Sequence, residues 1–217
     1  MTDPQPEPGL CLVASAEAGA GWLARLRAAL AATKAQTLIL TAPEGAAFDT
    51  GVTRPLVEMS QGMDIATLLA DDVEAARSVH ADGVHLTSRP DIEEAYAAAR
   101  ATLGDRAIVG VDAGGSRHDA MTLGDAGADY IAFSRSVGTD GSATFPATQQ
   151  ALVAWWSDLF VVPVVAFDVE APAEASAVIH SGADFIAVRL PHAAPEKDDT
   201  AWAAALIAAL GSPSGAA

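Results

Sequence analysis

One short motif occurs three times in this chain and largely decides what the chain can fold into. Residues 125–133, 181–188 and 80–86 each place a small residue and an aspartate before a run of apolar residues. In two copies the small residues include a glycine, Gly127 or Gly182, where a chain leaving a helix favours a positive φ angle. The apolar run that follows is too short for a helix and is rich in β-favouring residues. Each copy therefore predicts a helix, a tight turn and a buried strand, and strands entered from helices in this way form a parallel sheet.

The rest of the chain continues this alternation. We expect strands at 10–15, 36–41, 64–70, 83–86, 107–111, 130–133, 161–167 and 185–188, and helices at 22–32, 55–61, 72–80, 90–103, 116–126, 147–159, 172–180 and 199–210. Closure into a single (β/α)8 TIM barrel is the economical interpretation of eight alternations, and an open α/β sheet remains the alternative. The predicted organisation is a disordered tail at 1–9, one barrel domain at 10–210 and a flexible tail at 211–217.

The charge balance excludes two classes of partner. The net charge is −16, so the surface lacks the basic patch that nucleic acid or an anionic membrane requires. The single cysteine, Cys11, permits no internal disulfide, which fits a reducing compartment, and it is expected to be a small core residue. With no secretory signal and no apolar run long enough to span a bilayer, we expect a soluble, cytoplasmic protein. The expected partner is a small molecule, phosphorylated or not, and a homodimer is compatible with the sequence.

A TIM barrel places its chemistry at the carboxyl ends of its strands, so the residues after each predicted strand are the site candidates. Arginines follow the fourth, sixth and eighth strands, and arginine grips phosphate or carboxylate with two parallel hydrogen bonds. The alternative is that these arginines pair with rim carboxylates in a lattice that holds no ligand. The candidate ligand-binding residues are Arg89, Asp112, Gly114, Gly115, Ser116, Ser134, Arg135, Asp168, Arg189 and His192.

The turn at Gly114, Gly115 and Ser116 is a candidate anion cradle, because backbone N–H groups at the start of a helix favour anions. A tight connection from strand to helix, without any ligand, explains the same residues. Asp112 stands just before the turn, and its charge would repel a phosphate unless a metal ion intervened.

Two histidines lie within predicted elements, and one of them is open to more than one interpretation. His85 lies inside a predicted strand between Val84 and Leu86, and whether it faces the barrel interior or the helix layer is left open by the sequence. His118 is expected on a helix surface. No metal-ligand spacing of histidine and cysteine is present.

The order of six short motifs resembles a known family. They are DDVEAA at 71–76, ADGVHL at 81–86, IVGV at 108–111, GADYI at 127–131, VPVVA at 162–166 and GAD at 182–184. Over about residues 64–190 their order and spacing resemble thiamine phosphate synthase and its thiazole tautomerase relatives. The resemblance implies a (β/α)8 barrel that joins a hydroxymethylpyrimidine diphosphate to a thiazole phosphate with loss of pyrophosphate, using Mg²⁺. It also implies that Asp71 and Asp72 match the family's acid pair, with Asp91 as a third candidate metal ligand.

The sequence departs from the family's pattern where the diphosphate is handled. The family has Gln-x-Arg-x-Lys after its second strand, whereas residues 41–44 here read TAPE. The serine after strand five is replaced by Asp112, and the Gly-Gly of strand seven, used for thiazole phosphate, by Phe167 and Asp168. The loop at 134–146 contains no lysine. These changes remove cations and add acids where a diphosphate would have to leave.

Two hypotheses of different classes follow. In the first, a thiamine phosphate synthase-like barrel of thiamine metabolism has lost or altered activity on a phosphorylated small molecule, with Arg89, Arg135 and Arg189 in place of the missing cations. In the second, the protein is a non-catalytic barrel that binds a ligand or a partner. The departures after strands two and seven favour the second hypothesis for the parent reaction. Mg²⁺ is the cofactor that the resemblance implies, and without a phosphorylated ligand we expect it to bind weakly or not at all.

Overall fold

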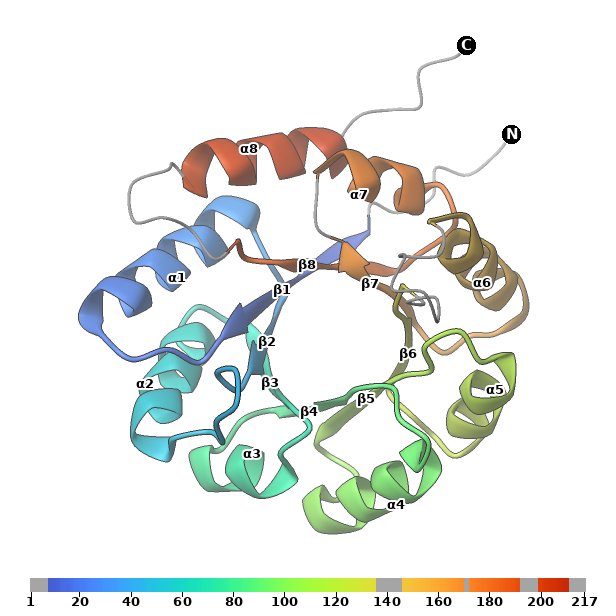
Figure 1. Ribbon diagram of the computed structural model, residues 1–217, viewed down its shortest axis with the longest axis horizontal. Coiled ribbons are helices and arrows are strands. Elements are labelled where there is room, and N and C mark those ends of the chain that lie inside the picture. Colours follow the sequence, from blue (N-terminus) through green and yellow to red (C-terminus); the bar gives the residue numbers. More distant parts are fainter. Residues whose placement is uncertain (1–7, 136–145, 170–171, 192–198, 211–217) are drawn as a thin grey trace.

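The computed structural model describes residues 8–135, 146–169, 172–191 and 199–210, which form a closed barrel (Figure 1). Eight parallel strands follow one another around the ring, and the last pairs with the first. They are β1 (Gly9–Ser15), β2 (Thr37–Thr41), β3 (Ala66–Ala70), β4 (Gly83–Leu86), β5 (Ile108–Asp112), β6 (Tyr130–Phe133), β7 (Val164–Val169) and β8 (Phe185–Arg189). The prediction of a single (β/α)8 TIM barrel is confirmed.

A helix follows each strand and packs on the outside of the ring. The helices are α1 (Ala20–Thr33), α2 (Thr50–Gln61), α3 (Val73–Val79), α4 (Ile92–Leu103), α5 (Arg117–Asp125), α6 (Pro146–Leu159), α7 (Pro172–Ile179) and α8 (Asp199–Leu210). In the ribbon view they surround the strands in sequence order (Figure 1). Within the described ranges, no helix has both the length and the apolar character needed to cross a membrane.

The strands bury both of their faces, in two separate apolar layers. One layer lies between strands and helices and contains Val84, Leu86 and Val111. The other fills the barrel interior and contains Phe167 and the cysteine predicted to be a core residue, Cys11. Burial raises the pKa of the Cys11 thiol to about 12, which keeps it in the unreactive protonated form.

The hydrogen bonds of the aspartate explain why the motif is repeated. In each copy the aspartate directly precedes an even-numbered strand. It forms hydrogen bonds with both the N–H and the carbonyl group of one residue in the preceding strand. Its Oδ2 accepts that residue's N–H at 2.7 or 2.8 Å, and its own N–H donates to the same residue's carbonyl at 2.8 to 3.2 Å. The pairs are Asp82 with Thr67, Asp129 with Val109 and Asp184 with Val164. Gly127 and Gly182 have φ angles of 92° and 89°, as the turn predicts.

Two predicted element boundaries are wrong by several residues. The helix predicted at 55–61 begins at Thr50, because the Asp49 side chain accepts the N–H groups of Gly51 and Val52 and so caps an earlier start. The strand predicted at 161–167 begins only at Val164 and extends to Val169. Pro163 has no N–H group to pair, which accounts for the late start.

Smaller shifts affect the other elements. The helix expected to open at Pro90 begins at Ile92, and β1 begins at Gly9, one residue inside the predicted N-terminal tail. Residues 1–7 and 211–217, which make up most of the two predicted tails, lie outside the described residues.

Candidate functional site

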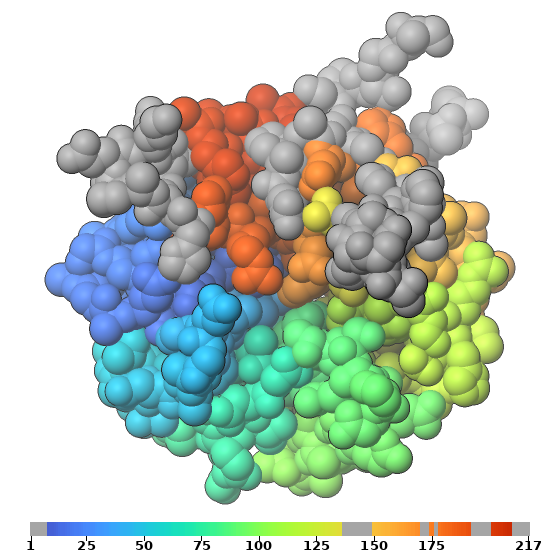
Figure 2. Space-filling model, viewed as in Figure 1, coloured from blue at the N-terminus to red at the C-terminus, as the bar shows by residue number. Residues whose placement is uncertain are grey.

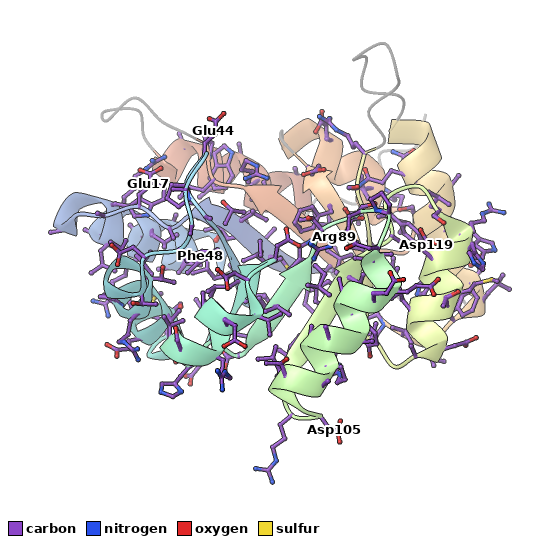
Figure 3. All side chains as sticks on the ribbon, turned by 60° about the horizontal axis from the view of Figure 1, so that its bottom comes forward. Glu17, Glu44, Phe48, Arg89, Asp105 and Asp119 are labelled. Atoms are coloured by element: carbon purple, nitrogen blue, oxygen red, sulfur yellow. The ribbon has the colours of Figure 1, made fainter. Side chains whose placement is uncertain are left out.

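The carboxyl ends of the strands open on one face of the barrel, and the predicted site residues follow those ends. Figure 2 looks onto this face, and in Figure 3 it lies towards the top, where Glu17 and Glu44 are labelled, with Arg89 nearer the middle of the view. Asp105, in the connection from α4 to β5, lies at the opposite end of the molecule (Figure 3). We call the space inside the ring at the upper face the barrel mouth.

Asp71 and Arg89 form an ion pair between the loops after β3 and β4. One oxygen of Asp71 accepts the backbone N–H of Thr87 at 2.9 Å, and the other accepts the Thr87 hydroxyl at 2.6 Å. The guanidinium of Arg89 donates to Asp71 Oδ1 at 3.2 Å, and both side chains are about one-third exposed. The charge of Arg89, a predicted phosphate ligand, is therefore already opposed by a carboxylate.

Asp72 and Asp91, the other two predicted metal ligands, have different surroundings. Asp72 Oδ1 accepts the N–H of Ala75 at 2.8 Å and so caps α3. The Asp91 side chain is 71% exposed, and its Oδ1 lies 4.0 Å from Nε of Arg89. Because both oxygens of Asp71 and Oδ1 of Asp72 already accept hydrogen bonds from the protein, the three acids do not form a ready set of ligands for Mg²⁺. A metal site at these residues stays a prediction.

Asp112 ends β5 and, among the residues that the structure describes, is the most deeply buried acid of the mouth, with only 4% of its surface exposed. Its neighbour Val111 packs against the helices, so strand alternation directs Asp112 into the barrel. Its Oδ1 accepts two backbone hydrogen bonds, from Gly114 N–H at 2.8 Å and from Ser134 N–H at 3.0 Å. Burial raises the pKa of the Asp112 carboxyl to about 6, although the hydrogen bonds from Ser134 and Gly114 lower it. A group with this pKa can hold or release a proton near neutral pH.

Asp168 contributes a second carboxyl from β7. The register of β7 against β8 shifts between Ala166 and Val169, and Asp168 within this irregularity has a φ of 57°, in the left-handed region that non-glycine residues seldom adopt. The charge of Asp168 adds to the rise in the pKa of Asp112, so the two carboxyls act on the same space. The structure thus brings together two acids that the sequence placed on separate strands.

The predicted glycine turn is a tight connection in which Asp112 takes part. Gly114 has a φ of 57°, which favours glycine, and a Cβ atom there would lie 2.7 Å from the hydroxyl of Ser88, which would have to move. Gly115 is exposed. Ser116 caps α5 by accepting the N–H of Asp119 at 3.1 Å.

The remaining rim candidates differ in what surrounds them. Arg135 donates to Glu174 at 3.2 Å, so a second predicted phosphate ligand faces a carboxylate. The Arg189 side chain is exposed at the end of β8, and no ion pair involving it occurs within the described ranges. Ser134 supplies the N–H already assigned to Asp112. His192 lies outside the described residues.

His85 faces the barrel interior, which settles the alternative that the sequence left open. Its ring stacks on Phe167 at 4.4 Å between centroids and 9° between planes, and its Nδ1 lies 2.8 Å from the Tyr130 hydroxyl. The residue is fully buried, and Nε2 has no hydrogen-bond partner among the described residues. Burial lowers the pKa of His85 to about 4, while the charge of Asp71 opposes this, so the ring is neutral at neutral pH.

A cluster of possible metal ligands that the sequence did not reveal lies between α4 and α5. Side-chain donor atoms of Glu93, His118 and Asp119 lie within 4.8 Å of one another. Glu93 and His118 are exposed, and both carboxylates stand in the first turn of a helix, where acids are favoured without a metal. No spacing in the chain predicts this group, because it depends on two neighbouring helices of the closed ring.

Comparison with known proteins identifies the family. A family model described as "Thiamine monophosphate synthase" matches residues 10–190. The chain belongs to this family. Thiamine-phosphate synthases from Erythrobacter litoralis and Rhodospirillum centenum are 37% and 36% identical over 138 and 137 residues. The matched segments span 62% and 63% of both this chain and the respective relative, so the activity that those names state is only a proposal for this chain.

A solved structure agrees with the fold. Thiamine phosphate pyrophosphorylase from Pyrococcus furiosus superposes with a TM-score of 0.70, at 22% identity, over 96% of this chain and 98% of that one. At this identity the likeness shows the barrel architecture alone. The predicted resemblance is confirmed at the level of family and fold.

Proposed function

We propose that this protein is a divergent family member that binds a small molecule at the barrel mouth and does not make thiamine phosphate at the rate of an intact family enzyme. One observation carries the proposal. Arg89 and Arg135, two of the three arginines expected to replace the family's cations, each face a carboxylate of the protein. The mouth also contains Asp112 and Asp168, which act on the same space. The positive charges that would have to stabilise the departing diphosphate are therefore already opposed by carboxylates of the protein.

The physical reason lies in the leaving group. Expelling a diphosphate requires cations or a metal in contact with its developing charge. A single pair of like charges 4 Å apart near a protein surface costs about 4 kcal/mol. A net loss of that size in the transition state slows a reaction by roughly a thousandfold.

A second candidate function is altered chemistry on a related ligand. The observation that favours it is Asp112, whose raised pKa of about 6 suits proton exchange with a bound molecule near neutral pH. A role in thiamine metabolism, a phosphorylated ligand, a cytoplasmic location and a homodimer stay predictions.

The test of the proposal is a synthesis assay. Purified protein is incubated with hydroxymethylpyrimidine diphosphate, thiazole phosphate and Mg²⁺, and thiamine phosphate is measured against the Erythrobacter litoralis enzyme under the same conditions. We expect turnover at least about a thousandfold below that of the relative. Turnover close to that of the relative contradicts the proposal, and its loss in Arg135→Ala would then identify the replacing cation.

A further inference from the structure

Asp112 does more than add negative charge to the mouth. Its Oδ1 accepts the N–H of Gly114 from the loop after β5 and the N–H of Ser134 from the loop after β6. Two main-chain donors from different loops that meet at one point are suited to hold an oxygen of an anionic ligand. In this protein a carboxylate of the chain itself occupies that point.

We infer that Asp112 sets the ligand class of the mouth: by occupying the Gly114 and Ser134 donors it excludes a phosphate there and leaves a position for a neutral or positively charged group. This inference rests on the proposed function, small-molecule binding at the mouth. An incoming phosphate would meet the like charge of Asp112 and would find both donors already bonded. Asp168, whose charge acts on Asp112, adds to the repulsion.

The interior next to Asp112 supports ligand binding independently. On the neighbouring strand, the fully buried His85 has an Nε2 atom with no partner among the described residues. An unpaired buried polar atom is costly unless something outside the chain satisfies it. The positions paired with these two residues are small, since Ala70 pairs with His85 and Ala132 with Asp112. Each polar group therefore has an alanine as its neighbour on one adjacent strand.

Three variants separate occupation of the donors from simple charge. Asp112→Ala removes the charge and frees both N–H groups. Asp112→Asn also removes the charge, but its amide oxygen can still accept them. Asp91→Asn removes an exposed rim carboxylate beside Arg89 and frees no backbone donor. A fourth variant, Asp112→Ser, is measured in parallel, because it also removes the charge and leaves only a short hydroxyl near the two N–H groups.

The measurement is calorimetric titration of each folded variant with pyrophosphate and with inorganic phosphate, at about pH 8, where Asp112 is ionised. We expect Asp112→Ala to bind pyrophosphate at least about tenfold more tightly than Asp112→Asn, Asp91→Asn and the unaltered protein. Equal gains in Asp112→Ala and Asp112→Asn overturn the inference, because charge alone would then explain them. No gain in any variant overturns it as well.

Folding behaviour is also decisive. If Asp112→Ala and Asp112→Ser fail to fold while Asp112→Asn folds, the oxygen is a structural acceptor of the loop and the inference fails. None of these results bears on the proposed low synthase activity, because that part of the proposed function fails only if the unaltered protein makes thiamine phosphate at a rate close to that of its relative.

Discussion

At the scale of single residues, two buried ionisable side chains on neighbouring strands have opposite effects on how the stability of the fold changes with pH. The pKa of Asp112 is raised from 3.8 to about 6, and the pKa of His85 is lowered from 6.5 to about 4. As pH falls from about 6.5 to 4, folded Asp112 takes up a proton that the unfolded chain does not, which stabilises the fold. His85 stays neutral in the folded state although it takes up a proton in the unfolded chain, which destabilises the fold. Each effect amounts to about 3 kcal/mol, so they nearly cancel.

Replacing Asp112 with asparagine should make the effect of His85 on the pH dependence of stability measurable. The raised pKa of Asp112 contributes stability that is fully present below pH 3.8 and is lost as pH rises through about 6. Without it, the free energy of unfolding of Asp112→Asn should fall by about 3 kcal/mol more than that of the unaltered protein between about pH 6.5 and 4. Urea unfolding at several pH values measures this. Asp105→Asn, exposed on the opposite face, is the control (Figure 3). Parallel pH profiles of Asp112→Asn and the unaltered protein would contradict the expectation.

The reverse change is expected for His85→Gln. The lowered pKa of His85 contributes stability that is present above pH 6.5 and is lost as pH falls through about 4. The variant should therefore gain about 3 kcal/mol relative to the unaltered protein over the same acid interval, whatever its absolute stability. The readout is the change of unfolding free energy with pH. A variant that loses stability in acid as steeply as Asp112→Asn would show that His85 is not the group responsible.

At the scale of elements, the repeated motif made most of the fold predictable. Strand and helix identities depend on local apolar runs and turn residues, and the sequence shows these directly. Boundaries depended on contacts that the sequence shows less clearly: Asp49 caps α2, which begins five residues before the predicted start, and Pro163 delays the start of β7.

The motif aspartate should be worth measurable stability. Asp184→Ala removes the acceptor of the Val164 N–H at 2.8 Å, on the buried first residue of β7. We expect the free energy of unfolding to fall by about 1–3 kcal/mol, the cost of leaving a buried donor unsatisfied. Chemical unfolding of Asp184→Ala beside Asp105→Ala, whose side chain is exposed, measures the difference. Equal stability of the two variants would mean that water replaces the carboxylate at no cost.

At the scale of the whole molecule, the candidate site was only partly predictable. The rule that barrels work at the carboxyl ends of their strands located the rim residues, but not their partners. The carboxylate that Arg135 faces belongs to Glu174, 39 residues away, and Asp112 shares its space with Asp168 from a non-adjacent strand. Such pairings are set by closure of the ring. For the same reason the Glu93, His118 and Asp119 cluster had no signature in the sequence.

The last prediction concerns Mg²⁺ and follows from the charge of the whole chain. A net charge of −16 attracts divalent ions diffusely, and this attraction is screened at about 0.15 M salt. A specific site needs free oxygen ligands, whereas Asp71 accepts three hydrogen bonds from Thr87 and Arg89, and Asp72 is bonded to the N–H of Ala75. Mg²⁺ should therefore bind weakly to the free protein in salt.

Calorimetry on three proteins separates the possibilities. Asp72→Ala should lower the free energy of unfolding by about 1 kcal/mol, through loss of the helix cap, and leave the heat of Mg²⁺ binding unchanged. Glu93→Gln serves as the matched variant at the other acidic group. Tight binding that disappears in Asp72→Ala would establish a metal site at the predicted acid pair, because a cap that merely stabilises α3 has no reason to change the affinity for Mg²⁺. Tight binding that disappears only in Glu93→Gln would place the ion between α4 and α5, where the donor atoms of Glu93, His118 and Asp119 lie within 4.8 Å of one another.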